Sequence, residues 1–423
     1  MSGDYSKYKH NHYVPEWYQR RFMLPDQAKL QYLDLNPEVM TRNGHSWARR
    51  NLLIRGPKLC FAQDDLYTTR WGTISNVDIE RFFFGELDDQ AKAAVKYFSE
   101  YDHTKIDQKS LHAFIRFMSV QKLRTPKGLA WLRSFTNSPN HNFTLQELQR
   151  LQNLFSATWT DAVWQIADAS QSPTKFIVSD NPVTIYNREC FPGSAVCLPP
   201  NDPDIRRAGT QTIFPLSLDK VLLVTNRTWV RNPYQDATKM GPNRRLMRDA
   251  MFNFTEIQTE RVLNEEEVRE INYIIKRRAL RYIAAAEKDW LYPEQYLRSD
   301  HWRKMGDGYL LMPDPRHVVM GGSIYVGYKG GRSEAFGSYG HRPWEPGYED
   351  EARDAVESRA LLKFQDEFSA MFGPKYRGIS MQFGRKIRRE EMEEFHRHHL
   401  DRDRNERKKP GERQRRRRLM RVS

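Results

Sequence analysis

The residues best placed to do chemistry lie in a short polar turn between two apolar runs. Residues 176–186 read Phe-Ile-Val-Ser-Asp-Asn-Pro-Val-Thr-Ile-Tyr, so Ser179, Asp180 and Asn181 separate two stretches with strand propensity. Pro182 has no amide hydrogen and favours an extended conformation at Asn181, so we expect the first strand to end at Asp180. Two interpretations of Asp180 follow. Its carboxylate either caps the turn or lines a cleft as a metal ligand or general base.

Three further residues whose side chains could take part in catalysis or binding lie in or beside predicted helices. His12 precedes a helix that is predicted to begin at Pro15, because proline suits the first turn of a helix. Its imidazole either packs within the fold or acts as a catalytic group. Glu80 lies inside a predicted amphipathic helix. Its carboxylate is either solvated or paired with a base, or it acts as a second catalytic carboxylate. Arg124 ends a helix at 110–124, where it would bond the last carbonyl groups or recognise an anion.

Hydrophobic periodicity predicts the elements that must position these residues. Two of the helices begin with a capping box, Thr144 with Glu147 and Asn264 with Glu267. The predicted helices are 15–22, 76–98, 110–124, 145–167, 265–286 and 355–372. The predicted strands are 29–35, 65–69, 176–179, 183–186, 212–216 and 221–225. We expect the last four strands to form one sheet, with a long loop at 187–209.

This pattern predicts an α+β fold, in which a mainly helical body packs on a small, mostly antiparallel sheet and a helical, basic extension follows. The expected body spans residues 1–292. A glycine-rich irregular linker is expected at 293–347 and a helical extension at 348–406. Residues 407–423 are expected to form a basic, disordered tail.

The positive charge of the chain is concentrated in that tail. The formal net charge is +14, and residues 407–423 contain nine Lys and Arg against Glu412 alone. The body is therefore only mildly basic. Arg415, Arg416, Arg417 and Arg418 are expected to contact the phosphates of DNA or RNA without sequence preference, in a salt-sensitive way.

The composition also bears on compartment and cysteine chemistry. No stretch approaches the roughly 18 consecutive apolar residues of a membrane helix, so we expect a soluble, cytoplasmic protein with no membrane partner. The three cysteines, Cys60, Cys190 and Cys197, match neither a disulfide framework nor a CxxC zinc pair. We expect them to be reduced thiols.

Several short motifs together resemble a bacterial domain-of-unknown-function family, number 4238. They are His12-Tyr-Val-Pro15, Gln121-x-x-Arg-Thr-Pro126, Ser179-Asp-Asn-Pro182, Pro215-Leu-Ser217 and Asn272 in a late helix, over roughly residues 9–292. Members of that family commonly open with two adjacent histidines. This chain has Asn11 before His12, so His10 would have to supply the second ring.

The resemblance implies positions for a site but no reaction. It nominates His12, Arg124 and Asp180, supported by Gln121, Ser179, Ser217 and Asn272. One hypothesis is a nucleic-acid-associated, metal-dependent phosphodiester hydrolase. In it Asp180, with Glu80 or His12, would hold a divalent cofactor such as Mg²⁺ or Mn²⁺, while Arg124 stabilises charge on the phosphate. The alternative is a non-enzymatic interaction module of a bacterial defence or mobile-element system, in which the same residues are structural.

Overall fold

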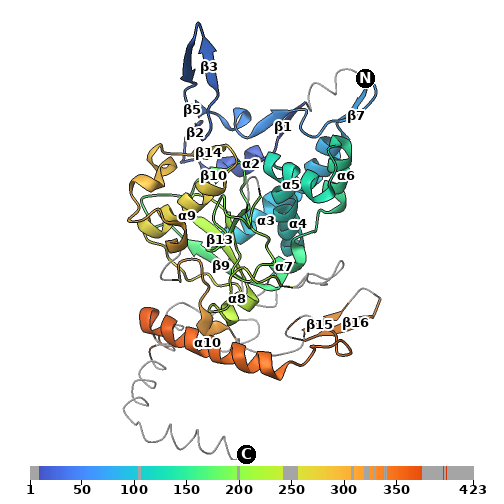
Figure 1. Cartoon of the computed structure of the whole chain (residues 1–423), viewed down its shortest axis with the longest axis vertical. Coiled ribbons are helices and arrows are strands. Elements are labelled where there is room, and N and C mark those ends of the chain that lie inside the picture. Colours follow the sequence, from blue (N-terminus) through green and yellow to red (C-terminus); the bar gives the residue numbers. More distant parts are fainter. Residues whose placement is uncertain are drawn as a thin grey trace, which may run out of the picture. The chain divides into compact units, whose positions relative to one another are not determined.

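The computed structural model divides the chain into two compact units (Figure 1). The first comprises Met1–Pro313 and Gly321–Asp350, and the second comprises Asp314–Met320 and Glu351–Ser423. The structure describes residues 9–102, 106–197, 201–241, 256–305, 309–318, 324–327, 330–337, 339, 341–373, 394 and 397. Helices and small antiparallel sheets give an α+β fold, which confirms the predicted class.

The first unit contains two four-stranded sheets, and all the strand pairs within them are antiparallel. In spatial order, sheet one consists of β10 (Val178–Ser179), β14 (Tyr282–Ala285), β2 (Leu30–Asp34) and β5 (Leu52–Arg55). Sheet two consists of β11 (Thr184–Tyr186), β12 (Gln211–Pro215), β13 (Lys220–Asn226) and β9 (Ala162–Asp168). The predicted β12–β13 hairpin is confirmed, with Leu223 opposite Ile213.

The polar elbow at 179–182 joins these two sheets. The prediction that both of its flanking strands lie in one sheet is wrong, because β10 pairs with β14 whereas β11 pairs with β12. The cause is local. The amide of Asp180 donates to the carbonyl of Tyr282, and Pro182 has no amide hydrogen with which to continue that ladder. The chain therefore leaves sheet one at the elbow and enters sheet two.

Four two-stranded ribbons surround the sheets or follow them in the chain. They are β1 (His10–His12) with β6 (Ala62–Asp64), β3 (Val39–Arg42) with β4 (His45–Ala48), β7 (Thr69–Trp71) with β8 (Ile74–Asn76), and β15 (Ile324–Gly327) with β16 (Ser333–Phe336). The strand predicted at 65–69 is wrong, because Asp65 has a φ of 57° and begins a turn. The segment predicted as an irregular linker contains the β15–β16 ribbon.

The helices of the first unit lie on both sides of the central strands, α3 to α6 on one side and α9 on the other in Figure 1. A π-helical turn, Ile79–Phe84, leads into α3. The helices are α2 (Glu16–Gln19), α3 (Gly85–Ser99), α4 (Gln108–Arg124), α5 (Pro126–Thr136), α6 (His141–Arg150), α7 (Ser156–Thr160), α8 (Arg227–Arg231) and α9 (Glu265–Arg278). Short 3-10 turns lie at Arg20–Phe22, Pro57–Leu59, Asp289–Leu291, Pro293–Gln295 and Trp302–Lys304.

Two of the predicted helices are too long. The helix expected at 145–167 is instead α6, α7 and strand β9, and the N-cap is Asn140 rather than Thr144. Strand β9 lacks the alternation of apolar and polar residues that marks a half-buried strand, because six of its seven residues are buried. The capping box of α9 is confirmed at Asn264 and Glu267, but that helix ends at Arg278 and the chain continues into β14.

Helix α4 forms the centre of the aromatic core. Phe114 and Phe117 are fully buried and pack against Phe214 of β12, with ring centroids 5.8 and 6.3 Å away. Tyr18 stacks on the same Phe214 ring at 5.5 Å and donates its hydroxyl to the carbonyl of Pro215. Burial of these large rings fixes α4 against sheet two.

The corner between α4 and α5 is unusually tight. Thr125 caps α5 by accepting a hydrogen bond from the amide of Gly128, and Pro126 takes the first helical position. A Cβ atom on Gly128 would lie 2.2 Å from the carbonyl oxygen of Lys122 and 2.5 Å from that of Leu123. Only glycine allows this approach, which brings the ends of the two helices together.

The second unit contains α10 (Glu351–Phe372), which packs on a 3-10 turn at Pro315–His317. Arg316 donates to the carbonyl of Gly373, at 2.8 Å, and Gln365 donates to that of Pro315, also at 2.8 Å. The predicted basic tail lies outside the described residues. No helix in the described ranges combines the length and the apolar character needed to cross a bilayer.

The α4–α5 corner gives a stability prediction. We expect Gly128→Ala to lower the free energy of unfolding by roughly 3 kcal/mol, because the added methyl group meets rigid carbonyls rather than flexible side chains. The matched control is Gly56→Ala, since a Cβ there would have only the carbonyl oxygen of Ala28 within 4 Å, at 3.6 Å. Urea unfolding measures both variants. Equal stability of the two would contradict the tight corner.

Candidate functional site

The predicted site residues do not converge on one place. His12 lies on the β1–β6 ribbon, where its Nε2 is 3.1 Å from the carbonyl oxygen of Lys58 and 3.7 Å from Glu16. Burial lowers the pKa of His12, and the Glu16 carboxylate partly opposes this. His10 lies beside it, with ring centroids 5.2 Å apart, and contacts the same Lys58 carbonyl. The two rings are therefore adjacent in space, although Asn11 separates them in sequence.

Asp180 is fully engaged by the main chain. Its two carboxylate oxygens accept hydrogen bonds from the amides of Leu280, Arg281 and Tyr282, at 2.8, 2.6 and 2.8 Å. Burial raises the pKa of this carboxyl, and the three amide bonds oppose that effect. These amides lie 100 to 102 residues away in sequence, so the carboxylate caps the start of β14 rather than its own turn, and neither sequence interpretation described this arrangement. The described residues also contain no group of three or more His, Cys, Asp or Glu suited to a metal ion.

The polar support residues make local bonds. Ser179 accepts from the amide of Asn181 at 3.2 Å, and Ser217 accepts from the amide of Asp219 at 3.3 Å in the β12–β13 turn. Asn272 of α9 accepts from the amide of Ile177 and donates to the carbonyl of Lys175. These bonds hold the segment that leads into β10, the elbow after β10 and the turn between β12 and β13.

One subset of the predicted residues does come together, around Arg124. Its guanidinium is completely buried, donates to Gln121 at 2.7 Å and pairs with Asp88 at 3.0 Å. Glu80, on the π-helical turn, faces the same charge. Burial raises the pKa of Glu80 to about 7, with Arg124 lowering it and Asp88 raising it. Gln121 also donates to the carbonyl of Tyr13, so the cluster links α4 to the N-terminal segment.

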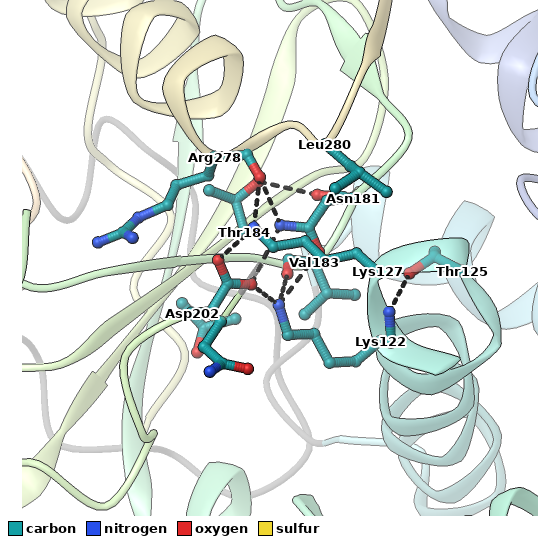
Figure 2. Close-up of polar contacts among 12 residues, drawn as sticks. Lys122, Thr125, Lys127, Asn181, Val183, Thr184, Asp202, Arg278 and Leu280 are labelled. Carbon is teal, nitrogen blue, oxygen red and sulfur yellow. Dashed lines mark hydrogen bonds and ion pairs between the residues drawn. The ribbon is translucent and has the colours of Figure 1, made fainter. Parts of the chain in front are cut away.

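A second polar cluster, which sequence reasoning missed, lies at the α4–α5 corner (Figure 2). Lys122 donates from Nζ to Asn181 Oδ1 and to the carbonyl of Val183, both at 3.1 Å, and also bonds Asp202. Lys127 donates to the other oxygen of Asp202 at 2.6 Å and to the carbonyl of Arg278 at 2.7 Å. The two lysines thus hold one carboxylate between them.

Asn181 and Arg278 complete this cluster. The Asn181 amide donates to Asp202 and to the carbonyl of Arg278, both at 3.1 Å. The Arg278 guanidinium has no carboxylate partner among the residues described. It donates instead to Cys197 Sγ at 2.9 Å and to the carbonyl of Cys190, and it lies over the Trp302 ring. Two lysines therefore bond a single aspartate, and Arg278 adds a third positive charge that acts on it without a direct bond.

The cluster perturbs its own titration. Burial alone would raise the pKa of Asp202, but Lys122, Lys127 and Arg278 outweigh it and hold that pKa well below its usual range. Burial lowers the pKa of Lys122 to about 8, against the opposing effect of Asp202. At neutral pH the aspartate is therefore ionised, and three basic side chains, Lys122, Lys127 and Arg278, act on this one carboxylate.

A cavity of about 440 Å³ opens beside this cluster, and we call it the Lys122 pocket. Part of its lining is aromatic: Trp131 and Phe135 are stacked at 4.9 Å, and Phe155 lies 6.0 Å from Trp131. The charged residues of the lining are Lys122, Lys127, Arg206, Arg207, Asp202 and Asp204. The pocket therefore combines ring faces with a surplus of cations.

Comparison with known proteins identifies one matching family. Its model, described as "Protein of unknown function (DUF4238)", matches residues 10–289. The chain belongs to the DUF4238 family. The match covers both sheets, the Arg124 cluster and the Lys122 pocket of this DUF4238 protein, and it confirms the resemblance drawn from the motifs. No curated protein and no solved structure matches the chain.

The DUF4238 motifs contained part of the signal for the missed residues. Lys122 and Lys127 flank the predicted helix end at Arg124-Thr-Pro126, and Asn181 lies within the elbow itself. Asp202 lies in a loop with no local pattern that links it to either lysine. Its partners are 80 and 75 residues away in sequence, so only the fold shows the pairing.

We expect a large loss of stability when the Asp202 carboxylate in the lysine–aspartate cluster is replaced by a neutral amide. Asp202→Asn should lower the free energy of unfolding by about 3–5 kcal/mol, because it leaves two buried ammonium groups without their counterion. The control is Asp204→Asn, whose partner Arg206 has a side chain 38% exposed, and it should cost less than about 1 kcal/mol. Denaturant titration compares them. Similar costs would mean that the cluster is solvated.

Glu80 predicts a pH dependence with a definite sign. Its folded pKa of about 7 is raised, so the folded protein keeps this proton at acid pH and loses stability as pH rises towards 7. Glu80→Gln removes that penalty. Its free energy of unfolding relative to wild type should increase by about 2 kcal/mol between pH 5 and pH 8. Glu86→Gln, on the exposed face of α3, is the control, and a Glu80→Gln difference that is constant with pH would contradict this account.

Proposed function

We propose that this protein is nucleic-acid-associated and binds a single-stranded segment in the Lys122 pocket. A base would lie against the Trp131–Phe135 face, and its phosphate would point towards the cations of the lining. The observation that carries the proposal is the composition of the pocket, where stacked rings and surplus positive charge share one cavity.

The aromatic wall is suited to an unpaired base. Trp131 is packed at the edge of the core, whereas Phe135, on the next turn of α5, is 58% exposed. Stacking on such rings contributes about 1–3 kcal/mol per base and tolerates any sequence, since every base has a π face. The exposed Phe135 ring, stacked on the half-buried Trp131, thus offers a platform to a base from the solvent side.

The charges of the lining suit a phosphate. Arg206 is neutralised by Asp204, at 2.6 Å, and Asp202 is shared between two lysines. Arg207 donates to the carbonyl of Thr238, but its buried Nε has no hydrogen-bond partner within the described part of the chain. Guanidinium and ammonium groups form their strongest hydrogen bonds with anionic oxygens. A phosphate would therefore offset the excess of positive charge.

The volume agrees with a ligand of nucleotide size. The cavity measures about 440 Å³, within the roughly 300–1,000 Å³ of pockets that hold small molecules and cofactors. We expect the protein to act in the bacterial cytoplasm. Residues Arg415 to Arg418 lie outside the described residues, and their nonspecific contact with DNA or RNA stays a prediction.

We leave metal-assisted hydrolysis out of this proposal, because three backbone amides already occupy the carboxylate of Asp180. The alternative, a non-enzymatic interaction module of a defence or mobile-element system, assigns no ligand to the pocket. A direct binding measurement distinguishes that alternative from ours.

The test is binding of a fluorescent single-stranded oligonucleotide to the full chain, followed by anisotropy at about 150 mM salt to suppress contacts of the tail. Phe135→Ala should weaken binding by roughly tenfold, because it removes one stacking partner. The matched control is Phe82→Ala, since Phe82 is also 58% exposed but lies outside the pocket. Absent binding, or equal affinity of the two variants, would refute the proposal.

A further inference from the structure

Two further hollows adjoin the Lys122 pocket. A middle hollow of about 650 Å³ shares Val196 with the pocket, and an outer hollow of about 500 Å³ shares Phe191 and Arg303 with the middle one. The shared lining residues make the middle hollow a neighbour of both the Lys122 pocket and the outer hollow. Residues of the loop between β11 and β12 line all three.

The middle hollow presents aromatic and charged groups together, with Arg188 and Arg303 against Glu189 and Asp236 in its lining. Phe191 is 39% exposed, and the guanidinium of Arg303 lies 5.9 Å from the centre of its ring. Glu189 is the only carboxylate that pairs with Arg188 and Arg303 in the described chain, at 3.4 and 3.1 Å. Two arginines thus share one acid, and each keeps further N–H groups for an anion.

The outer hollow also combines aromatic and basic side chains. Its lining includes Tyr273 and Arg277 from α9, with the Arg277 guanidinium 6.0 Å from the centre of the Tyr273 ring. Arg277 is exposed and forms no ion pair within the residues described. His301 and Arg303 add further basic groups, against Asp300 alone.

We infer that the Lys122 pocket, the middle hollow and the outer hollow form one strand track, which binds a single-stranded nucleic acid several nucleotides long. This inference rests on the proposed function and extends it from one nucleotide to a polynucleotide. In the track, Trp131–Phe135 and Phe191 offer ring faces to successive bases, while Arg303 and Arg277 contact successive phosphates.

The alternation of rings and cations favours a single strand over a duplex. In a duplex the bases are already stacked and paired, so exposed aromatic side chains gain nothing from them. Unpaired bases can stack on such rings, and a basic groove then follows the backbone. A track built for duplex phosphates would require cations without interleaved aromatic groups.

The experiment is a length series of labelled oligothymidylates, with about 2, 4, 8 and 12 nucleotides, titrated with the full chain. Affinity should rise at least about tenfold between the shortest and the 8-nucleotide probe. Arg277→Ala should weaken the 12-nucleotide complex about fivefold, leave the 2-nucleotide complex unchanged and reduce the salt slope by about 0.7, the contribution of one single-strand phosphate contact.

Matched controls distinguish the track from the pocket. Arg298→Ala removes an arginine that is 87% exposed and lies outside the three hollows, and it should leave every complex unchanged. Phe191→Ala should weaken long probes only, whereas Phe143→Ala, at a residue that is 40% exposed on α6, should have no effect.

Three outcomes would overturn the track. Affinity independent of length, with Phe135→Ala still impaired, would leave the proposed function standing and remove the track. A duplex bound as tightly as the single strand, with the same loss in Arg277→Ala, would assign the groove to duplex phosphates. Absence of binding to every probe would remove the proposed function together with the track.

Discussion

The fold depends on one buried carboxylate that fixes a turn of the main chain. Asp180 accepts the amides of Leu280, Arg281 and Tyr282, immediately after α9 ends and where β14 begins. Charge-assisted bonds of this kind contribute about 1.5–3 kcal/mol each. Since β14 lies inside sheet one and Asn181 next door bonds the carbonyl of Arg278, this single contact aligns both sheets with the end of α9. The elbow is therefore a structural junction, and the pocket is built against it.

The Lys122 pocket combines that rigidity with an electrostatic imbalance. Lys122, Lys127 and Arg278 all act on Asp202, so within the described chain three buried basic side chains share one carboxylate. Burying charge is costly unless it is paired. Under the proposed function, an anion in the pocket would relieve part of this cost, and the tight α4–α5 corner at Gly128 already holds the two lysines in place. The residues that carry this buried charge are thus also those through which the proposed ligand would be bound.

Much of the fold could be predicted from sequence, since the apolar stripes of α3, α4 and α9 and the capping box at Asn264 are local signals. The errors arose where tertiary context overrides them: β9 is buried on both faces and resembles a helix, and β10 and β11 belong to different sheets because of pairings made by β14 and β12. For the site, Arg124, Gln121 and Glu80 were found together. Asp202 was missed because no local pattern marks a residue whose partners lie in distant helices.

Sheet one has a consequence for the order of events during synthesis. Strand β2 lies between β5, which follows soon after it, and β14, in which Tyr282 pairs with Asp34. The edge of β2 that pairs with β14 therefore stays unpaired while about 250 further residues are synthesised. Unpaired strand edges promote aggregation. The β2–β5 pair can form early, but the sheet closes only after Ala285 emerges from the ribosome. Until that point the edge of β2 that β14 covers has no partner strand from sheet one.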